Sequence, residues 1–522
     1  MLILLLEAGF DLTLSQIIKM SKTDVKTEQP SSSVDDVSSG LVDDTVIELD
    51  SELERRTLRK FDRFLLPPLA VILLLAYLDR SNLGMLVKPP HSVAPLLTHT
   101  PTGNAKVFGF EEGLGLVGNQ FNIVSTCFYP AYVALEVLWT MAVKRYGAKH
   151  VLGVAMVSWS AVTLANGFIH NYAQAIALRV LLGAFEAGLV PCVVFIISTI
   201  WAREDQAKRN AIIYGCNCLS GAFGGLIAYA IESMGTRLGL EAWRWLFIIE
   251  GGISIFLCSV CWVLLPSHAE DAWFLTAEEQ ELMRARKHRD IAHRGDDRDA
   301  MKYTKMALTD VNVYLAAICL FCCSIPLFGF GTFLPSIIKG LGYTSLQANY
   351  LTIPVYVLAT ITLATATFVS DWLKKRTPVL LVMVLPVIIG YIIVSSTANA
   401  AAGFFAMFMF GSGIYAFNCL LLTWVSNNLA PDYKRSVGVP LFICLGNISG
   451  IASSNIYPST DAPRYLIGNA VSAGTESLAL ICVLGMWWAF RSRNADKERL
   501  RAEGNESNGK EGDRALDFVY NL

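Results

Sequence analysis

The stretch TPVLLVMVLPVIIGYIIVS, residues 377–395, contains 19 residues and no charged side chain. A helix needs about 20 mostly apolar residues to cross the hydrocarbon core of a bilayer. The sequence holds eleven further runs of this kind, near 63–87, 117–140, 151–168, 172–201, 211–231, 243–265, 311–338, 347–370, 401–426, 436–457 and 466–490. Continuous apolar runs are typical of membrane helices, whereas barrel strands alternate in short segments. The sequence therefore predicts an all-α membrane protein with twelve transmembrane helices.

The composition of the 522-residue chain supports this prediction. Apolar residues make up 53% of the chain and charged residues only 16%, whereas soluble domains carry about a quarter charged residues. The net charge of −2 gives no indication of a nucleic-acid partner. All twelve cysteines fall inside apolar runs, which favours a packing role over disulfides or a metal site. We expect no metal and no cofactor.

A polar break at residues 266–310 separates the first six predicted helices from the last six. We therefore predict an N-terminal six-helix bundle at 61–265 and a C-terminal six-helix bundle at 311–490. Residues 1–60 are rich in Ser and Asp and are predicted to be a disordered tail. Residues 491–522 are also polar and are predicted to be a flexible tail.

The loops that connect the predicted helices differ in their content of Lys and Arg. Cytoplasmic loops of membrane proteins carry an excess of these residues. One set of loops carries eleven of them, whereas the alternate set, counted after the first helix pair, carries only three, namely Arg237, Lys339 and Arg464. We therefore predict that the first set and both termini are cytoplasmic, in the plasma membrane. The cytoplasmic break contains a predicted amphipathic helix at 275–289, with Thr276 as its cap and Glu279 at the capping-box position.

Four ionisable residues fall at membrane depth in the first and fourth predicted helices. Asp79 and Arg80 lie in the first helix, and Arg179 and Glu186 lie in the fourth, seven residues apart and hence on one face. Charged groups at this depth are costly and usually face a cavity or a partner. An arginine offers a planar fork that suits a carboxylate, and a carboxylate can take up a proton. These residues are candidates for binding substrate and protons, and the alternative is a structural ion-pair network between the two helices.

Other polar residues of the predicted spans are assigned different roles. Tryptophans flank Arg244, which favours anchoring at the headgroup level for it and for Glu250. A gate or packing role is expected for Glu136, near the cytoplasmic end of its helix. The loop residues Lys144, Arg145 and Asp371 are expected to be gate or structural residues, since their loops occupy equivalent positions in the two halves. The residues Asn82, Asn418 and Asn447 are possible pocket-lining residues, although membrane asparagines more often bond a neighbouring helix.

Several motifs resemble those of one transporter family, the anion:cation symporters of the major facilitator superfamily, which includes fungal allantoate, nicotinate and pantothenate permeases. The resemblance covers roughly residues 55–490 and rests on LDRSNLG at 78–84, RVLLGAFEAG at 179–188, WRWLFIIEG at 243–251 and WVSNN at 424–428. It implies a major facilitator fold and proton-coupled symport of a small organic anion by a monomer. It also implies that Asp79, Arg80, Arg179 and Glu186 handle substrate and proton.

Two departures from the family pattern are visible. The family usually continues the second helix as Glu-Val-Pro-Ser-Asn, whereas this chain reads EVLWT at 136–140. The family also runs directly from the motif ending at Gly84 to the sequence beginning at Asn104. We interpret residues 85–103 as a retained intron and Met20 as the true start.

Alternative functions follow from the same sequence. The main alternative is a major facilitator that exports a secondary metabolite. A nutrient sensor would carry long structured tails, and an enzyme would need a catalytic cluster at one membrane face. The seven histidines lie in loops, at interfaces or within residues 85–103, so the sequence predicts a transporter and not an enzyme.

Overall fold

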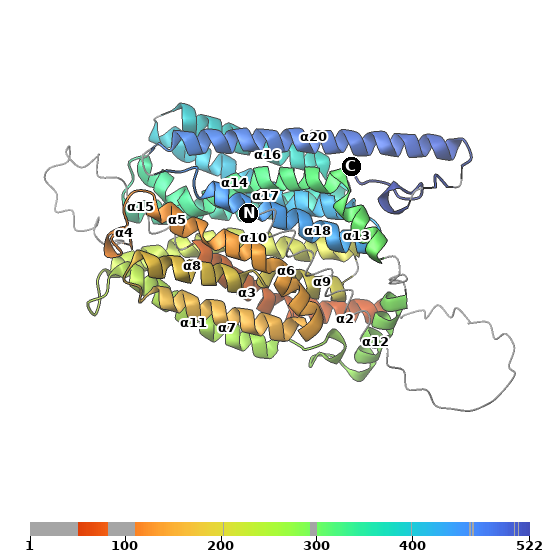
Figure 1. Cartoon of the computed structure of the whole chain (residues 1–522), viewed down its shortest axis with the longest axis horizontal. Helices are drawn as coiled ribbons and strands as arrows, with labels where there is room; N and C mark the ends of the chain where they lie inside the picture. Colours follow the sequence, from red (N-terminus) through yellow and green to blue (C-terminus); the bar gives the residue numbers. More distant parts are fainter. Residues whose placement is uncertain are drawn as a thin grey trace. The chain divides into compact units, whose positions relative to one another are not determined.

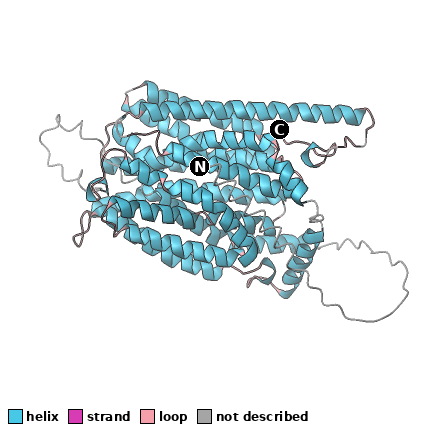
Figure 2. Cartoon of the chain, in the orientation of Figure 1, coloured by secondary structure: helices cyan, strands magenta, loops and turns pink. Residues whose placement is uncertain are grey.

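The computed structural model describes residues 51–81, 110–201, 203–292, 300–397, 399–458, 461, 464–505, 507–509 and 511–522. These residues are almost entirely helical (Figures 1 and 2). The helices of the first half are α2 (Ser51–Phe64), α3 (Leu66–Ser81), α4 (Phe110–Gly113), α5 (Gln120–Thr126), α6 (Phe128–Tyr146), α7 (Ala148–Asn166), α8 (Tyr172–Glu186), α9 (Leu189–Ile200), α10 (Arg203–Met234) and α11 (Ala242–Leu264). The remainder are α12 (Ala277–Ala292), α13 (Ala300–Leu308), α14 (Val311–Gly340), α15 (Ser345–Leu373), α16 (Thr377–Ser396), α17 (Ala400–Asn427), α18 (Asp432–Asn447), α19 (Ser449–Ser453) and α20 (Leu466–Ala502).

Within the described residues, eleven helical segments are long and apolar enough to cross a membrane. A twelfth apolar segment, Val437–Ser453, is shorter and is divided between α18 and α19. Large apolar side chains such as Phe256, Phe368 and Trp488 are 67%, 74% and 70% exposed, as expected where lipid is the solvent. The predicted all-helical membrane fold is confirmed.

Two further spans that the sequence predicts as single helices are also interrupted. The second span divides into α5 and α6 at Cys127, and the fourth divides into α8 and α9 at Ala187 and Gly188. A proline, Pro130 or Pro191, is the third residue of the second helix in each case. Proline has no backbone N–H and cannot bond the carbonyl of the residue four positions earlier. That residue is Thr126 for Pro130 and Ala187 for Pro191, so each break lies where this helical hydrogen bond is missing. Broken helices are common at transporter binding sites.

The two halves meet along α10 and α15, where small residues allow close approach. A Cβ atom added to Gly221 would lie 2.4 Å from the ring of Tyr356, and one added to Gly225 would lie 2.5 Å from Thr352 Oγ1. Both glycines face α15 one helical turn apart. Gly221 and Gly225 therefore serve helix packing at this contact.

A second contact between the halves joins α5 to the region that follows α18. The Asn122 side-chain amide donates to the Tyr457 carbonyl at 3.4 Å, and the Asn455 amide donates to Thr126 Oγ1 at 2.9 Å. These residues lie at the ends of the helices opposite to the Lys- and Arg-rich loops. Hydrogen bonds of this kind fix one helix against another inside a bilayer.

The predicted amphipathic helix of the central loop is present as α12, which packs against α2. Glu279 Oε2 accepts from the Thr276 backbone N–H at 2.8 Å, which is half of the predicted capping box. The same oxygen accepts from Lys60 Nζ of α2 at 2.7 Å. Arg286 Nη1 of α12 lies 3.2 Å from Glu54 Oε1 of α2. Ion pairs therefore fasten the loop helix to the helix that precedes the first span.

We expect Glu279→Gln to loosen α12 from α2. Burial raises the pKa of the Glu279 carboxyl, but hydrogen bonds from Lys60 and Thr276 outweigh it and leave the pKa below its usual value. A lowered pKa in the folded state stabilises docking at neutral pH, and this contribution is lost as pH falls through that pKa. Losing a hydrogen bond to a charged partner costs about 1.5–3 kcal/mol. The protection of the α12 amides against hydrogen exchange, taken relative to the intrinsic rate at each pH, should therefore fall in E279Q and in acid. It should not fall in the exposed neighbour variant E278Q, and equal protection in both variants would contradict this.

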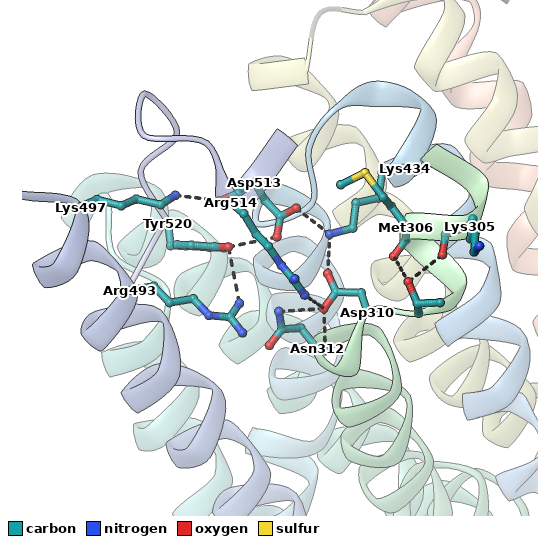
Figure 3. A network of polar contacts seen from close by, with 11 residues as sticks. Lys305, Met306, Asp310, Asn312, Lys434, Arg493, Lys497, Asp513, Arg514 and Tyr520 are labelled. Atoms are coloured by element: carbon teal, nitrogen blue, oxygen red, sulfur yellow. Dashed lines mark hydrogen bonds and ion pairs between the residues drawn. The ribbon is translucent and has the colours of Figure 1, made fainter. Parts of the chain in front are cut away.

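The C-terminal segment folds back onto the C-terminal half around a buried lysine (Figure 3). Lys434 of α18 is 1% exposed and bonds two carboxylates, Asp310 before α14 and Asp513 of the C-terminal segment. Tyr520 Oη donates to Asp513 Oδ2 at 3.0 Å, and Lys497 Nζ donates to the Asp513 carbonyl at 2.7 Å. The network therefore joins α14, α18 and α20 through one short stretch of chain.

Residues after the last predicted span were expected to form a flexible tail, and the structure differs. Helix α20 continues past residue 490 to Ala502. The Asn521 carbonyl accepts from Trp424 Nε1 at 2.8 Å and from Asn428 Nδ2 at 3.0 Å. The stretch is polar because its polar groups bond to helix ends, which composition alone does not distinguish from a solvated tail.

Candidate functional site

The end of α3 places two adjacent charged residues against different helices. Successive helical residues point about 100° apart. Asp79 faces α7, where its Oδ2 accepts from Trp159 Nε1 at 2.9 Å and Thr163 Oγ1 at 3.2 Å. Arg80 faces α8, where its Nη2 lies 2.5 Å and its Nε 3.1 Å from Glu186 Oε1. The first helix thus connects the third and fourth spans at the predicted site.

Aromatic rings surround the Arg80 guanidinium. Its Cζ lies 4.8 Å from the ring centroid of Phe128, 5.1 Å from that of Tyr132 and 5.5 Å from that of Tyr77. Arginine is attracted to ring faces at such distances, and the attraction is strongest away from water. The break between α5 and α6 begins the second of these helices at Phe128, so the interrupted span supplies two of the three rings.

Arg179 lies near this ion pair without joining it. The side chain is 3% exposed, and neither Nε nor Nη2 has a hydrogen-bond acceptor among the described residues. Its Cζ lies 6.0 Å from the ring centroid of Phe247 on α11. Two carboxylate oxygens nearby, Glu186 Oε2 and Asp79 Oδ1, also lack a partner within the described chain. The site therefore contains buried donors and acceptors that the protein does not satisfy.

The sequence places these four residues in one region, and the structure adds their pairing. The spacing of Arg179 and Glu186 puts them on one face of α8, yet Glu186 bonds Arg80 instead. Trp159 and Thr163 were not among the residues predicted from the sequence. They lie four residues apart on one face of α7, and this spacing of two polar groups in an apolar helix was the available signal.

Glu136 and Asn447 join the two halves. Asn447 Nδ2 of α18 lies 3.5 Å from Glu136 Oε2 of α6. Trp139, one of the residues that departs from the family pattern, donates from Nε1 to the Ala184 carbonyl at 2.7 Å. A Cβ atom added to Gly188 would lie only 2.8 Å from the Trp139 ring. The tryptophan therefore packs against the break between α8 and α9.

The other predicted residues lie outside this cluster. The Arg244 guanidinium donates to the carbonyls of Gly167 and Ile169, at 3.2 and 2.7 Å, and so fastens α11 to the loop after α7. Asn418 bonds the Cys323 and Ile414 carbonyls within the C-terminal half. The Arg244 and Asn418 side chains therefore hold neighbouring helices together.

The remaining predicted residues occupy several places. Glu250 is 1% exposed on α11, Asp371 pairs with Arg376 at 2.9 Å, and the Arg145 guanidinium lies 5.4 Å from the ring centroid of Tyr146. Asn82 lies outside the described residues, as does the side chain of Lys144. In the described part of the chain, no group of three or more His, Cys, Asp or Glu residues could hold a metal.

Comparison with known proteins accounts for the two bundles of helices. A family model described as Major Facilitator Superfamily matches residues 69–454, well over half of the chain. The chain belongs to the major facilitator superfamily. The predicted family and fold are confirmed at this level.

Relatives within the superfamily match along nearly the whole chain. An uncharacterized transporter of Schizosaccharomyces pombe is 36% identical over 445 residues, 85% of each protein. The high-affinity nicotinic acid transporter of Saccharomyces cerevisiae is 29% identical over 504 residues, which cover 96% of this chain and 89% of that protein. These relatives and the family identify a multi-pass membrane transporter and not an enzyme.

Solved structures of the superfamily share the fold. The proton:xylose symporter XylE, bound to 6-bromo-6-deoxy-D-glucose, superposes with a TM-score of 0.61 and 14% identity, covering 81% of this chain and 95% of that one. A bacterial homologue of the human lysosomal transporter Spinster gives a TM-score of 0.58 and 14% identity, covering 83% and 96%. Identity this low establishes the major facilitator architecture alone.

Proposed function

We propose that this transporter is a proton-coupled symporter of a small organic anion, located in the plasma membrane with both termini cytoplasmic. The observation that supports it best is the buried Arg179 guanidinium, whose Nε and Nη2 lack an acceptor within the described chain. A buried cation is costly unless it is paired and hydrogen-bonded. A carboxylate matches the arginine fork with two parallel bonds. A substrate carboxylate would supply the acceptor that the protein does not.

The surroundings of Arg179 favour a small aromatic carboxylate. Phe247 lies on one side of the guanidinium, and an aromatic ring on the substrate would find an apolar neighbour there. The yeast relative at 29% identity is named as a nicotinic acid transporter. Nicotinate, a single ring with one carboxylate, is therefore the first compound to test.

Proton coupling follows from the Arg80–Glu186 ion pair. A proton on Glu186 would remove the counter-ion of Arg80 and release that guanidinium for the substrate. Anion and proton binding would then each favour the other, and such coupling is reciprocal by thermodynamic linkage. Asp79 lies beside this pair with one oxygen unpartnered and is the second carboxylate of the proposed mechanism. Alternating access would move one half against the other along the α10–α15 contact.

Uptake of labelled nicotinate by a host that lacks its own transporter tests this proposal. We expect accumulation at acidic external pH, less at neutral pH, and loss of accumulation with a protonophore. Competition by other small carboxylates would define the substrate class. Absence of uptake, with pH-independent export of a preloaded compound, would instead support the efflux alternative.

We expect Asp79→Asn and Glu186→Gln to abolish proton-driven accumulation while substrate exchange across the membrane continues. The amide cannot gain or lose the proton, but it keeps the size of the side chain. Asp496→Asn, an exposed substitution on the extension of α20, is the matched control and should behave as wild type. Unchanged accumulation in both D79N and E186Q would remove these carboxylates from the coupling mechanism.

A further inference from the structure

A buried carboxylate in the C-terminal half belongs to no ion pair of the described chain. Glu476 lies on α20 and is 0% exposed. Neither Oε1 nor Oε2 has a hydrogen-bond partner among the described residues. Glu476 was not among the site residues predicted from the sequence. An acid in this position requires an explanation, since polar groups buried in proteins are almost always bonded.

Contacts one turn on either side show which way Glu476 faces. Ser472, four residues earlier, bonds the Tyr457 hydroxyl at 3.1 Å. Three residues later, the carbonyl of Ala479 accepts a hydrogen bond from the Cys319 thiol of α14 at 3.5 Å. Residues three and four apart share one helical face. Glu476 therefore faces the inside of the C-terminal half, where α20 packs against α14 and α16.

The titratable groups on this side of the bundle are weakly acidic. The titratable neighbours are three thiols of α14, one phenol of α16 and one phenol before α20: Cys319, Cys322, Cys323, Tyr391 and Tyr457. No Lys, Arg or His of the described residues forms an ion pair with Glu476. An ionised carboxylate without a cation in such a place costs several kcal/mol. A proton on the carboxyl group removes that cost.

The last span of the N-terminal half also carries a buried acid. Helix α11, the last span of that half, packs against α3 and α7, just as α20 packs against α14 and α16. Glu250 on α11 is 1% exposed, and its neighbour Gly251 approaches the Leu164 backbone of α7, where a Cβ atom would lie 2.5 Å from the nitrogen. In each half the last span therefore presents a buried acid to the first and third spans. Internal repeats of this kind are the rule in transporters.

We propose that Glu476 is a second proton-binding site, located in the C-terminal half and separate from the Asp79–Glu186 cluster. The carboxyl holds a proton while α20 is packed against α14, and it releases the proton when that contact admits water. The hydroxyl groups of Ser472, Tyr457 and Tyr391 lie on its side of the bundle and line the route by which that water takes the proton away. Each transported anion is then accompanied by one more proton than the first cluster supplies. This proposal deepens the proposed symport and rests on it for its role in transport.

Carbodiimide labelling of the purified full-length protein in nanodiscs tests the site directly. The probe, dicyclohexylcarbodiimide, reacts with protonated carboxyl groups in apolar surroundings, and peptide mass spectrometry locates the adduct. We expect a label on Glu476 that declines as pH is raised and is absent in Glu476→Gln. Glu498→Gln, an exposed change on the same helix, should label as wild type does. No label at any pH, or a label that does not change with pH, would overturn the proposal.

Transport measurements separate this proposal from the proposed function. In a nicotinate uptake assay, E476Q should lower the proton-to-anion ratio by about one, because one titratable group is removed, while pH-driven uptake persists. Glu476→Asp should restore the ratio. If nicotinate is not transported, the labelling result still decides whether Glu476 exchanges a proton. An unchanged ratio in E476Q, together with normal uptake, would overturn its role in transport.

Discussion

Replacing Arg179 should abolish anion uptake without harming the fold. Arg179→Gln removes the unpaired guanidinium that we propose binds the substrate carboxylate. A hydrogen bond to a charged group contributes about 1.5–3 kcal/mol, and each 1.4 kcal/mol is a factor of ten. Since the fork makes two such bonds, we expect uptake at limiting substrate to fall by about a hundredfold or more. Arg179→Lys keeps the charge but not the fork, and a loss of about tenfold is expected.

The stability of the same variant provides an independent test. The Arg179 Nε and Nη2 atoms are buried without acceptors in the described chain, so removing the charge should leave the melting temperature unchanged or raise it. Arg237→Lys, an exposed loop substitution, is the control for both measurements. Normal nicotinate affinity in R179Q would contradict the substrate role. A marked fall in its melting temperature would show that the guanidinium is instead part of a structural network.

Replacing Lys434 should have the opposite effect, with a large loss of stability. Lys434→Met leaves Asp310 and Asp513 as buried anions without their shared cation. Breaking a buried ion pair in this way costs about 3–5 kcal/mol. We expect a marked decrease in the melting temperature of the purified protein and early proteolysis of the C-terminal segment. The exposed substitution Lys305→Met should have no such effect.

A triple variant distinguishes lost charge balance from lost packing. In Lys434→Met combined with Asp310→Asn and Asp513→Asn, the charges are removed together, so much of the stability should return. If the triple variant is no more stable than K434M, the loss of stability comes from the lost packing of the Lys434 side chain and not from unbalanced charge. If K434M itself melts as wild type does, the network does not hold the C-terminal segment.

The sequence predicted the spans well because lipid imposes a simple rule on length and polarity. It predicted the region of Asp79, Arg80, Arg179 and Glu186 for the same reason, since charges at this depth are rare. It could not assign the Arg80–Glu186 pair, because the pairing depends on how α3 and α8 are rotated about their axes. The breaks before α6 and α9 were missed, although Pro130 and Pro191 were visible signals for them.

Other features required the folded chain. Glu476 lies in an apolar run, and only its burial and unpartnered oxygens distinguish it from an acid that faces water. The C-terminal segment reads as a solvated tail because its bonds from Asp513 to Lys434 and from Asn521 to Trp424 and Asn428 span the whole of α20 and more of the sequence. Long-range partners of polar groups are not encoded in local composition.

The folded C-terminal segment offers a fixed point for following this transporter through its cycle. The contacts described for residues 511–522 all join it to helices of the C-terminal half, so it should travel with that half as one body. An antibody fragment raised against this surface would therefore bind every transport state equally well. It would serve as a fiducial for electron cryomicroscopy of a small membrane protein without selecting one conformation.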